Sequence, residues 1–370
     1  MIQFLDMKAP YLELKDELDE AYFRFMNSGW YVLGPETEAF EKAFAEYCGT
    51  KFCVGVSNGL DALCLGLEAG GVKKGDDVIV PANTYIATWL AISQVGATPV
   101  PVEPAPGTFN IDPARIEEAI TPRTTAIAAV HLFGVPADMA PIMEIAKKHN
   151  LFVLEDNAQS QGAIYRGKRT GALGHAGALS FYPGKNIGAF GEAGAVTTDD
   201  PEIADKVRML RNYGSKVKYH NEVKGYNRRI DSMQAAFLAV KLKYLDEWNE
   251  RRRKIAARYL EKLSGIPELE LPHAALEASV WHQFIVRCDQ RDELQKFLVD
   301  HEIQTMIHYP IPPHLSKAYA DMNFKRGDFP LSERMADTVL SLPIGPHLKP
   351  EEADCVAAAI REFFLGKTLR

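Results

Sequence analysis

The sequence has 370 residues, of which 46% are hydrophobic and 25% are charged. A chain of this length and composition buries a large core, which excludes a disordered, collagenous or coiled-coil protein. The net charge of −7 disfavours general nucleic-acid binding, because such binding needs clustered positive charge.

Short apolar runs alternate with helical patterns between about residues 50 and 240. The runs at 77–81, 98–102, 125–131, 151–155, 178–182 and 195–198 predict buried strands, and a short apolar segment at 54–56 precedes them. The connections carry apolar residues at helical spacing, as at 139–149. Strands of this kind separated by helices are typical of an α/β fold with a mainly parallel sheet covered on both faces.

The pattern changes after residue 231. One long helical stretch over 231–263 has a charged face and an apolar face, and it is long enough to link two domains. An alternating segment at 280–287, a helix at 292–301 and a last helix beginning near Pro350 predict a smaller α+β domain. We therefore divide the chain into a large domain, 1–240, and a small domain, 241–370. The first ~35 residues are expected to pack on the small domain or on a partner subunit.

Ligands of open parallel sheets bind beyond the carboxyl ends of the strands. Ser57, Asn58 and Gly59 follow the segment at 54–56 and precede an apolar helix. The free backbone N–H groups of such a helix start can bind a phosphate, and a glycine lets the phosphate approach closely. A plain helix cap is the commoner interpretation of this segment on its own.

An acid and an amine follow two other strands. Asp156 ends the strand at 151–155, where a carboxylate needs a cationic partner or a capping role. Lys185 follows a Pro-Gly turn and is either a solvated lysine or a nucleophilic amine of lowered pKa. Tyr85 lies where it could stack on a ring. Pyridoxal 5'-phosphate carries a phosphate, a pyridine nitrogen and an aldehyde. These three groups match the anion site, the carboxylate and the amine, respectively.

At these residues the chain resembles the DegT/StrS-type nucleotide-sugar aminotransferases, a pyridoxal-phosphate family of fold type I. The matching segments are GWYVLGPETEAFE (29–41), SNGLDAL (57–63), VPANTYIAT (80–88), VHLFG (130–134), EDNAQSQGA (155–163), SFYPGKNIGAFGEAGAV (180–196), RNYGSKVKYHNEVKGYNRRIDSMQAA (211–236) and IHYPIPPH (307–314). The resemblance implies a three-layer αβα domain with a mainly parallel seven-stranded sheet and a smaller α+β C-terminal domain.

The resemblance also implies roles for single residues. Lys185 stands at the Schiff-base position, Asp156 pairs with the pyridine nitrogen, and Asn227 reaches the phosphate from the neighbouring subunit of a homodimer. The cofactor-binding residues that it implies are Ser57, Asn58, Gly59, Tyr85, Asp156, Gln159, Ser180, Lys185 and Asn227. Those that it implies for the sugar nucleotide are Tyr182, His308, Tyr309, Lys218 and Arg229.

Within the family, the segments around the lysine and at 307–314 resemble the enzymes that aminate C3 of dTDP-3-oxo-6-deoxyhexoses, with L-glutamate as the donor and ping-pong kinetics. The alternatives are a C4 aminotransferase and a non-catalytic, regulatory relative that only binds the cofactor. Sugar dehydratases of this scaffold carry a histidine at the position of Lys185, so the lysine argues against them. A Rossmann dehydrogenase fits poorly because no GxGxxG opens a βαβ unit.

Two further expectations concern location and metals. The N-terminus has no basic leader before an apolar core, and no stretch reaches the ~18 apolar residues of a membrane span. The five cysteines form no Cys-x-x-Cys pair, which favours reduced thiols in the cytoplasm. No metal site, nucleic-acid partner or membrane partner is predicted.

Overall fold

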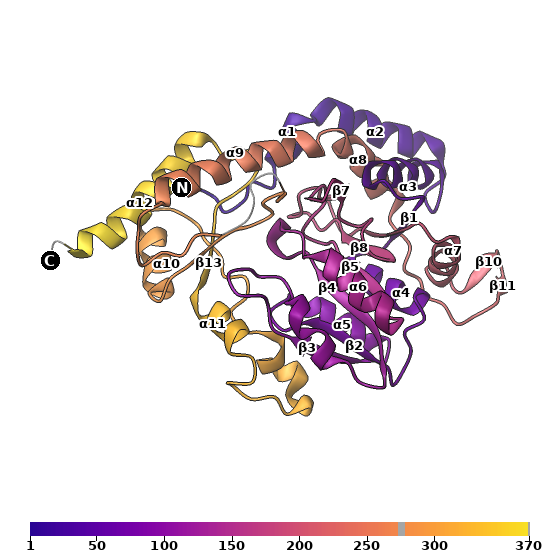
Figure 1. Ribbon diagram of the computed structural model, residues 1–370. Helices are drawn as coiled ribbons and strands as arrows, with labels where there is room; N and C mark the ends of the chain where they lie inside the picture. The colour runs from indigo at the N-terminus through magenta and orange to yellow at the C-terminus, as the bar shows by residue number, and fades with distance from the viewer. Residues whose placement is uncertain (273–277, 369–370) are drawn as a thin grey trace.

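The computed structural model describes residues 1–272 and 278–368. Within these residues the large domain is built on a seven-stranded sheet with the order β1-β9-β8-β5-β4-β2-β3 (Figure 1). Its strands are β1 Phe52–Val56, β2 Asp77–Pro81, β3 Thr98–Val102, β4 Thr124–Val130, β5 Phe152–Asp156, β8 Ala176–Ser180 and β9 Gly194–Thr198. Strand β9 is antiparallel to both of its neighbours, and the remaining pairs are parallel. The predicted fold class, with a mainly parallel sheet, is confirmed.

Helices cover both faces of this sheet. Alternate residues of one strand face opposite sides, so Val78 joins the core beneath one helical layer and Ile79 the core beneath the other. The layers contain α4 Gly59–Ala69, α5 Ile86–Gln94 and α7 Pro201–Leu210 on one side, and α3 Pro35–Cys48, α6 Met139–His149 and α8 Ser232–Leu242 on the other. Burial of each such aliphatic or aromatic side chain stabilises the folded state by roughly 1.5–3 kcal/mol. The two helical layers therefore stabilise the sheet from both faces.

The small domain packs an antiparallel strand pair against helices (Figure 1). Its elements are α9 Leu245–Leu263, β12 Phe284–Arg287, α10 Arg291–Asp300, α11 Pro330–Thr338, β13 Val339–Leu342 and α12 Pro350–Thr368. Tyr259 of α9 and Phe284 of β12 are fully buried in its core, with ring centroids 5.0 Å apart. None of the helices in the described residues combines the length and apolarity that crossing a bilayer requires.

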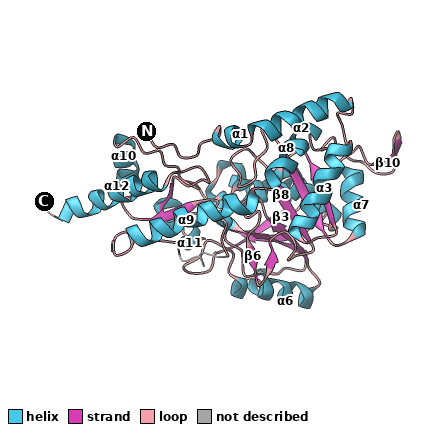
Figure 2. Ribbon diagram, turned by 90° about the horizontal axis from the view of Figure 1, so that it is seen from above, coloured by secondary structure: helices cyan, strands magenta, loops and turns pink. Residues whose placement is uncertain are grey.

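Short elements complete the described chain. They are helices α1 Ala9–Glu13 and α2 Lys15–Ser28, the strand pairs β6 Ile164–Tyr165 with β7 Lys168–Arg169 and β10 Ser215–Val217 with β11 His220–Asn221, and the 3-10 turns Pro113–Arg115, Glu117–Ala119, Leu132–Gly134, Pro313–Leu315 and Lys317–Met322. The β10–β11 hairpin extends outward beyond α7 (Figures 1 and 2).

The prediction of one uninterrupted helix over 231–263 was wrong. The structure breaks it into α8 and α9 at Lys243 and Tyr244, where the backbone N–H groups bond three residues back, to Val240 and Lys241. The break lets α8 pack in the large domain against α3, while α9 runs on to the small domain and packs against α12. The helix is therefore interrupted because its two halves pack in different cores, although the amphipathic pattern is continuous.

The N-terminal segment contacts both domains. Ile2 pairs with Ile303 of the small domain, its N–H donating to Glu302 O over 2.8 Å. Helix α2 instead packs on α8. The expected packing on the small domain therefore holds for the first residues, whereas packing on a partner subunit stays a prediction.

Candidate active site

Asp156 is the last residue of β5 and lies at the carboxyl edge of the sheet. Its carboxylate accepts hydrogen bonds from Thr88 Oγ1 of α5 over 2.8 Å and from Ala158 N over 3.2 Å. Burial raises the pKa of Asp156, and these two donors and the positive charge of Lys185 only partly offset that rise. A buried carboxylate of this kind is suited to a cationic ligand group, such as a protonated ring nitrogen.

Lys185 lies on a tight turn after β8. Its N–H donates to Tyr182 O over 2.8 Å, and Gly188 approaches so closely that a Cβ there would lie 2.2 Å from Pro183 O. Burial lowers the pKa of Lys185 to about 8, against an opposing effect of Asp156. A substantial fraction of this amine is therefore neutral near pH 8, as nucleophilic attack on an aldehyde requires.

The turn before α4 follows β1 and brings together small and polar residues at the start of the helix. Asn58 caps the helix, its Oδ1 accepting from Asp61 N over 2.9 Å. A Cβ at Gly59 would lie 2.6 Å from Ser180 Cβ, so the glycine brings Ser180 against the helix start. The first N–H groups of a helix have no partner within it, and at this turn that of Asp61 is bonded by Asn58. The predicted phosphate residues Asn58, Gly59 and Ser180 are thus brought together.

An ion pair that the sequence interpretation missed supports this turn. Asp61 accepts hydrogen bonds from Ser57 Oγ and from Asn58 Nδ2, the latter over 3.1 Å. Its second oxygen lies 2.9 Å from Arg228 Nε. Asn58 and Asp61 have the spacing of a capping box, which is the signal that could have identified Asp61.

Aromatic and amide groups form the wall next to Asp156. Gln159 Nε2 donates to Tyr309 Oη over 3.0 Å, and its Oε1 accepts from Phe133 N over 2.7 Å. The rings of Tyr85 and Tyr309 are 5.0 Å apart between centroids. Burial raises the pKa of Tyr309, so this phenol stays protonated and available as a donor at neutral pH.

Two imidazoles lie in the field of Lys185. Burial and the lysine charge lower the pKa of His308 to about 4, and they lower that of His282 well below its usual range. His308 Nδ1 lies 2.7 Å from Ser341 Oγ, and His282 Nδ1 lies 3.1 Å from Asn186 Oδ1. Both rings are therefore neutral at physiological pH. His282 carried no motif that singled it out in the sequence.

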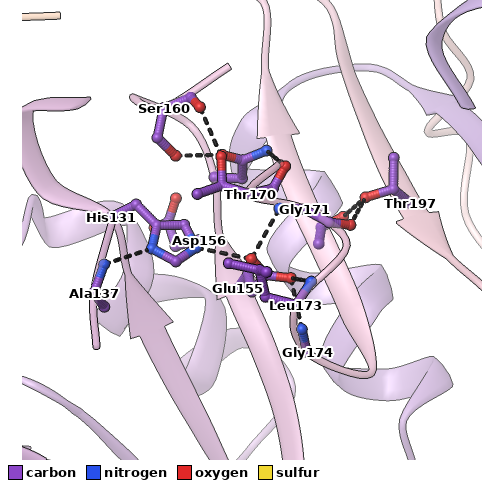
Figure 3. A network of polar contacts seen from close by, with 12 residues as sticks. His131, Ala137, Glu155, Asp156, Ser160, Thr170, Gly171, Leu173, Gly174 and Thr197 are labelled. Carbon is purple, nitrogen blue, oxygen red and sulfur yellow. Dashed lines mark hydrogen bonds and ion pairs between the residues drawn. The ribbon is translucent and has the colours of Figure 1, made fainter. Parts of the chain in front are cut away.

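A buried network on the other face of β5 holds the strand in place (Figure 3). Glu155 lies 2.8 Å from His131 Nε2 and accepts from the N–H groups of Gly171, Leu173 and Gly174 over 2.7–2.8 Å. His131 Nδ1 accepts from Ala137 N over 3.0 Å, so Nε2 carries the proton that it donates to Glu155. Because strand side chains alternate, Glu155 anchors the strand while Asp156 faces α5.

The remaining predicted residues lie further from this group or open to solvent. Tyr182 is 54% exposed after β8. Lys218 lies between β10 and β11, on the hairpin that extends beyond α7 (Figure 1). Asn227 is exposed, and Arg229 Nη1 donates to Asn212 Oδ1 over 2.8 Å. Within one chain, the structure therefore does not bring Lys218 to Lys185.

Comparisons with known proteins agree with the chemistry of this edge. Residues 13–361 match the model of the DegT/DnrJ/EryC1/StrS aminotransferase family. The chain is 54% identical to the erythromycin biosynthesis sensory transduction protein EryC1 of Saccharopolyspora erythraea, over 97% of this chain and 99% of that protein. It is 53% identical to the dTDP-3-amino-3,6-dideoxy-alpha-D-galactopyranose transaminase of Aneurinibacillus thermoaerophilus, over 98% and 99%.

A solved structure has the same fold throughout. The S. venezuelae protein DesV, crystallised in complex with a ketimine intermediate, superposes with a TM-score of 0.96. It is 53% identical, and the match covers 98% of both chains. The resemblance stated from the sequence is therefore confirmed for the family and for the fold.

Proposed function

Because this chain belongs to the DegT/DnrJ/EryC1/StrS aminotransferase family, we propose that it is a pyridoxal-phosphate-dependent transaminase acting on nucleotide sugars. Its reaction moves the amino group of L-glutamate to the C3 keto group of a dTDP-3-oxo-6-deoxyhexose. The observation that carries the proposal is the convergence of Lys185, Asp156 and the turn at Asn58 on one sheet edge. The name of the Aneurinibacillus relative supports the dTDP sugar and the C3 position.

The residues at this edge fit pyridoxal phosphate. The first backbone N–H groups of α4 at Gly59 and the Ser180 hydroxyl would hold the phosphate, while Ser57 and Asn58 support the turn through their bonds to Asp61. Asp156 would hold the ring nitrogen, since it is a buried carboxylate with no resident counter-ion bonded to it among the described residues. When bound, the cofactor supplies an aldehyde that accepts the amino group and a ring that withdraws electrons.

The chain's own groups then divide the remaining work. Asp156 keeps a proton on the ring nitrogen, a preference worth ~1.4 kcal/mol for each pKa unit. Lys185 Nζ, partly neutral because of burial, would take the proton from the donor's Cα and deliver it to the carbon that carries the cofactor's aldehyde. Gln159, which is bonded to Tyr309, and Tyr85, whose ring lies beside that of Tyr309, would border the cofactor ring.

The sugar nucleotide would lie over the open side of this site. Tyr182, His308 and Tyr309 are proposed to contact the sugar, and Lys218 and Arg229 its pyrophosphate. Lys218 lies on the hairpin, beside the exposed Tyr219 and Val217, which are 84% and 62% exposed. Exposed apolar side chains on a projecting hairpin are typical of a subunit contact. We therefore propose a homodimer in which Lys218 and Asn227 serve the partner's site.

A second candidate rests on the name of one relative. The Saccharopolyspora protein, at 54% identity, is called a sensory transduction protein, which fits a regulatory relative that binds the cofactor without turnover. The two functions differ in one observable, since only a transaminase removes the amino group of glutamate.

The deciding experiment uses the purified chain loaded with pyridoxal phosphate. L-glutamate should change the visible absorbance of the bound cofactor and release 2-oxoglutarate, and a dTDP-3-oxo-6-deoxyhexose added next should yield a 3-amino product by NMR. Lys185→Arg should lose turnover by at least ~10³-fold, whereas Lys243→Arg, an exposed control, should not. Loaded protein that leaves glutamate unchanged would refute the transaminase, and a 4-amino product would refute the C3 position.

A further inference from the structure

A small cavity lies beside Lys185, lined on one side by the N-terminal segment. Its volume is about 40 Å³, which holds roughly three water molecules. Leu5 contributes to the wall and reaches across to Gly184 and Gly345, so that the first residues cover the turn that carries Lys185. Lys185 itself is one of the lining residues, so the cavity adjoins the turn that carries the proposed reacting amine.

Two buried cations line this cavity, Lys241 of α8 and Arg252 of α9, which are 3% and 2% exposed. Lys241 Nζ donates to Gly188 O over 2.6 Å and lies 3.5 Å from the centroid of the Phe190 ring. Arg252 Nη1 donates to the carbonyl oxygens of Trp281 and Ile344 at 3.3 and 3.2 Å. Arg252 Nε has no hydrogen-bond partner.

Neither cation has a carboxylate partner among the described residues. The nearby acids are already engaged, since Asp6 accepts from the N–H groups of Lys8 and Ala9 at the start of α1. Glu13 is bonded by Trp248 and paired with Arg251 and His347. Asp6 also lines the cavity, but within the described residues its carboxylate forms no ion pair with Lys241 or Arg252.

Burying unpaired charge is costly, and the structure shows the effect on both groups. Burial lowers the pKa of Lys241 to about 7 and that of Arg252 to about 10. An anion in the cavity would offset this cost, because it would supply the negative partner that these cations lack.

We propose that this cavity binds a carboxylate of the amino-acid donor, with Lys241 and Arg252 as its charge partners. The inference rests on the proposed function, in which the donor's amino group must come to the position of the Lys185 amine. An α-amino acid carries its carboxylate one carbon away from that amino group, and the cavity beside Lys185 has room for a small polar group. The planar guanidinium of arginine and the ammonium group of lysine are the usual partners of carboxylates.

The test measures binding of glutarate, a dicarboxylate without an amino group, to the loaded enzyme by calorimetry. Lys241→Met removes the charge and keeps the chain length, and Lys243→Met removes an exposed lysine paired with Glu17 nearby. Glutarate should bind the wild type and the Lys243→Met control alike, and Lys241→Met on the order of 10- to 100-fold more weakly. Equal binding by Lys241→Met and wild type, or no binding by wild type, would overturn the inference.

Two measurements distinguish a carboxylate-binding role of Lys241 from a purely structural one. Lys241→Met should keep the affinity for pyridoxal phosphate while the glutamate concentration for half-maximal single turnover rises at least tenfold. Arg252→Lys retains the charge without the planar fork, so it should weaken glutarate binding to a smaller extent and provides the test if Lys241→Met does not fold.

The outcome also separates this inference from the proposed function. Amination of the keto sugar with an unchanged glutamate dependence in Lys241→Met would refute the carboxylate site and leave the transaminase standing. Glutarate binding that depends on Lys241, without amination of any keto sugar, would refute the transaminase and support the site.

Discussion

Arg228 and Asp61 form an ion pair of 2.9 Å directly behind the turn that begins α4. The pair is only partly exposed, at 20% and 16% for the two side chains. The main chain reinforces it, because Ser57 N donates to Arg228 O over 3.1 Å. A negative side chain so close to the proposed phosphate site would repel a phosphate unless the arginine neutralised it.

Replacing Arg228 should therefore weaken cofactor binding. Arg228→Met leaves Asp61 as an uncompensated charge beside the phosphate, and we expect the dissociation constant for pyridoxal phosphate to rise roughly tenfold or more. Fluorescence titration of the apoprotein measures it. Arg115→Met is the matched control, since Arg115 pairs with the exposed Glu118 and should leave the constant unchanged. Equal effects of the two variants would contradict the role given to the ion pair.

The lowered pKa of Lys185 predicts how cofactor attachment depends on pH. Only the neutral amine attacks an aldehyde, so the rate of attachment should rise through pH of about 8 and level off above it. The negative charge of Asp156 raises this pKa, so Asp156→Asn should move the midpoint to lower pH. Stopped-flow absorbance of apoprotein mixed with pyridoxal phosphate follows the rate.

His308 and His282 do not disturb this profile, because the pKa values of both lie below the range in question. Lys185→Arg provides the blank, since it lacks the reacting amine. A midpoint near the ordinary lysine pKa of 10.5, or a shift to higher pH in Asp156→Asn, would disprove the assignment.

The packing of Gly59 against Ser180 gives a third prediction. A Cβ at residue 59 would lie 2.6 Å from Ser180 Cβ, closer than real side chains approach, so Gly59→Ala must displace Ser180 from the helix start. We expect affinity for pyridoxal phosphate to fall by about tenfold or more, with a smaller change for pyridoxal, which has no phosphate. Gly366→Ala, where nothing lies within 4 Å, is the control and should bind both normally.

The sequence predicted the reactive residues at the sheet edge, but not the residues that bond to them and hold them in place. Parallel strands end at one edge, so Asp156 and Lys185 could be placed together from strand order and motifs alone. Thr88 and Arg228 could not, because their contacts to Asp156 and Asp61 join segments far apart in the chain. The same holds for His282, whose neutrality comes from burial and from Lys185.

The break between α8 and α9 shows a different limit. The amphipathic pattern runs through Lys243 and Tyr244 without a proline or glycine, so local sequence gave no stop signal. The helix breaks there because α8 packs in the core of the large domain and α9 in that of the small domain. Tertiary packing, which no local window contains, decided this boundary.

The Glu155 network predicts that one buried acid stabilises the large domain without touching the ligand. Glu155→Ala would leave His131 and three backbone N–H groups without their acceptor, at a cost of roughly 3 kcal/mol or more. The apoprotein's melting temperature should fall on the order of 5–10 °C. Glu118→Gln removes a 67% exposed acid paired with Arg115 and should change it by at most about 1–2 °C. Scanning calorimetry of the wild type, Glu155→Ala and Glu118→Gln measures these melting temperatures. If Glu155→Ala melts at the same temperature as the wild type, the network does not stabilise the strand that carries Asp156.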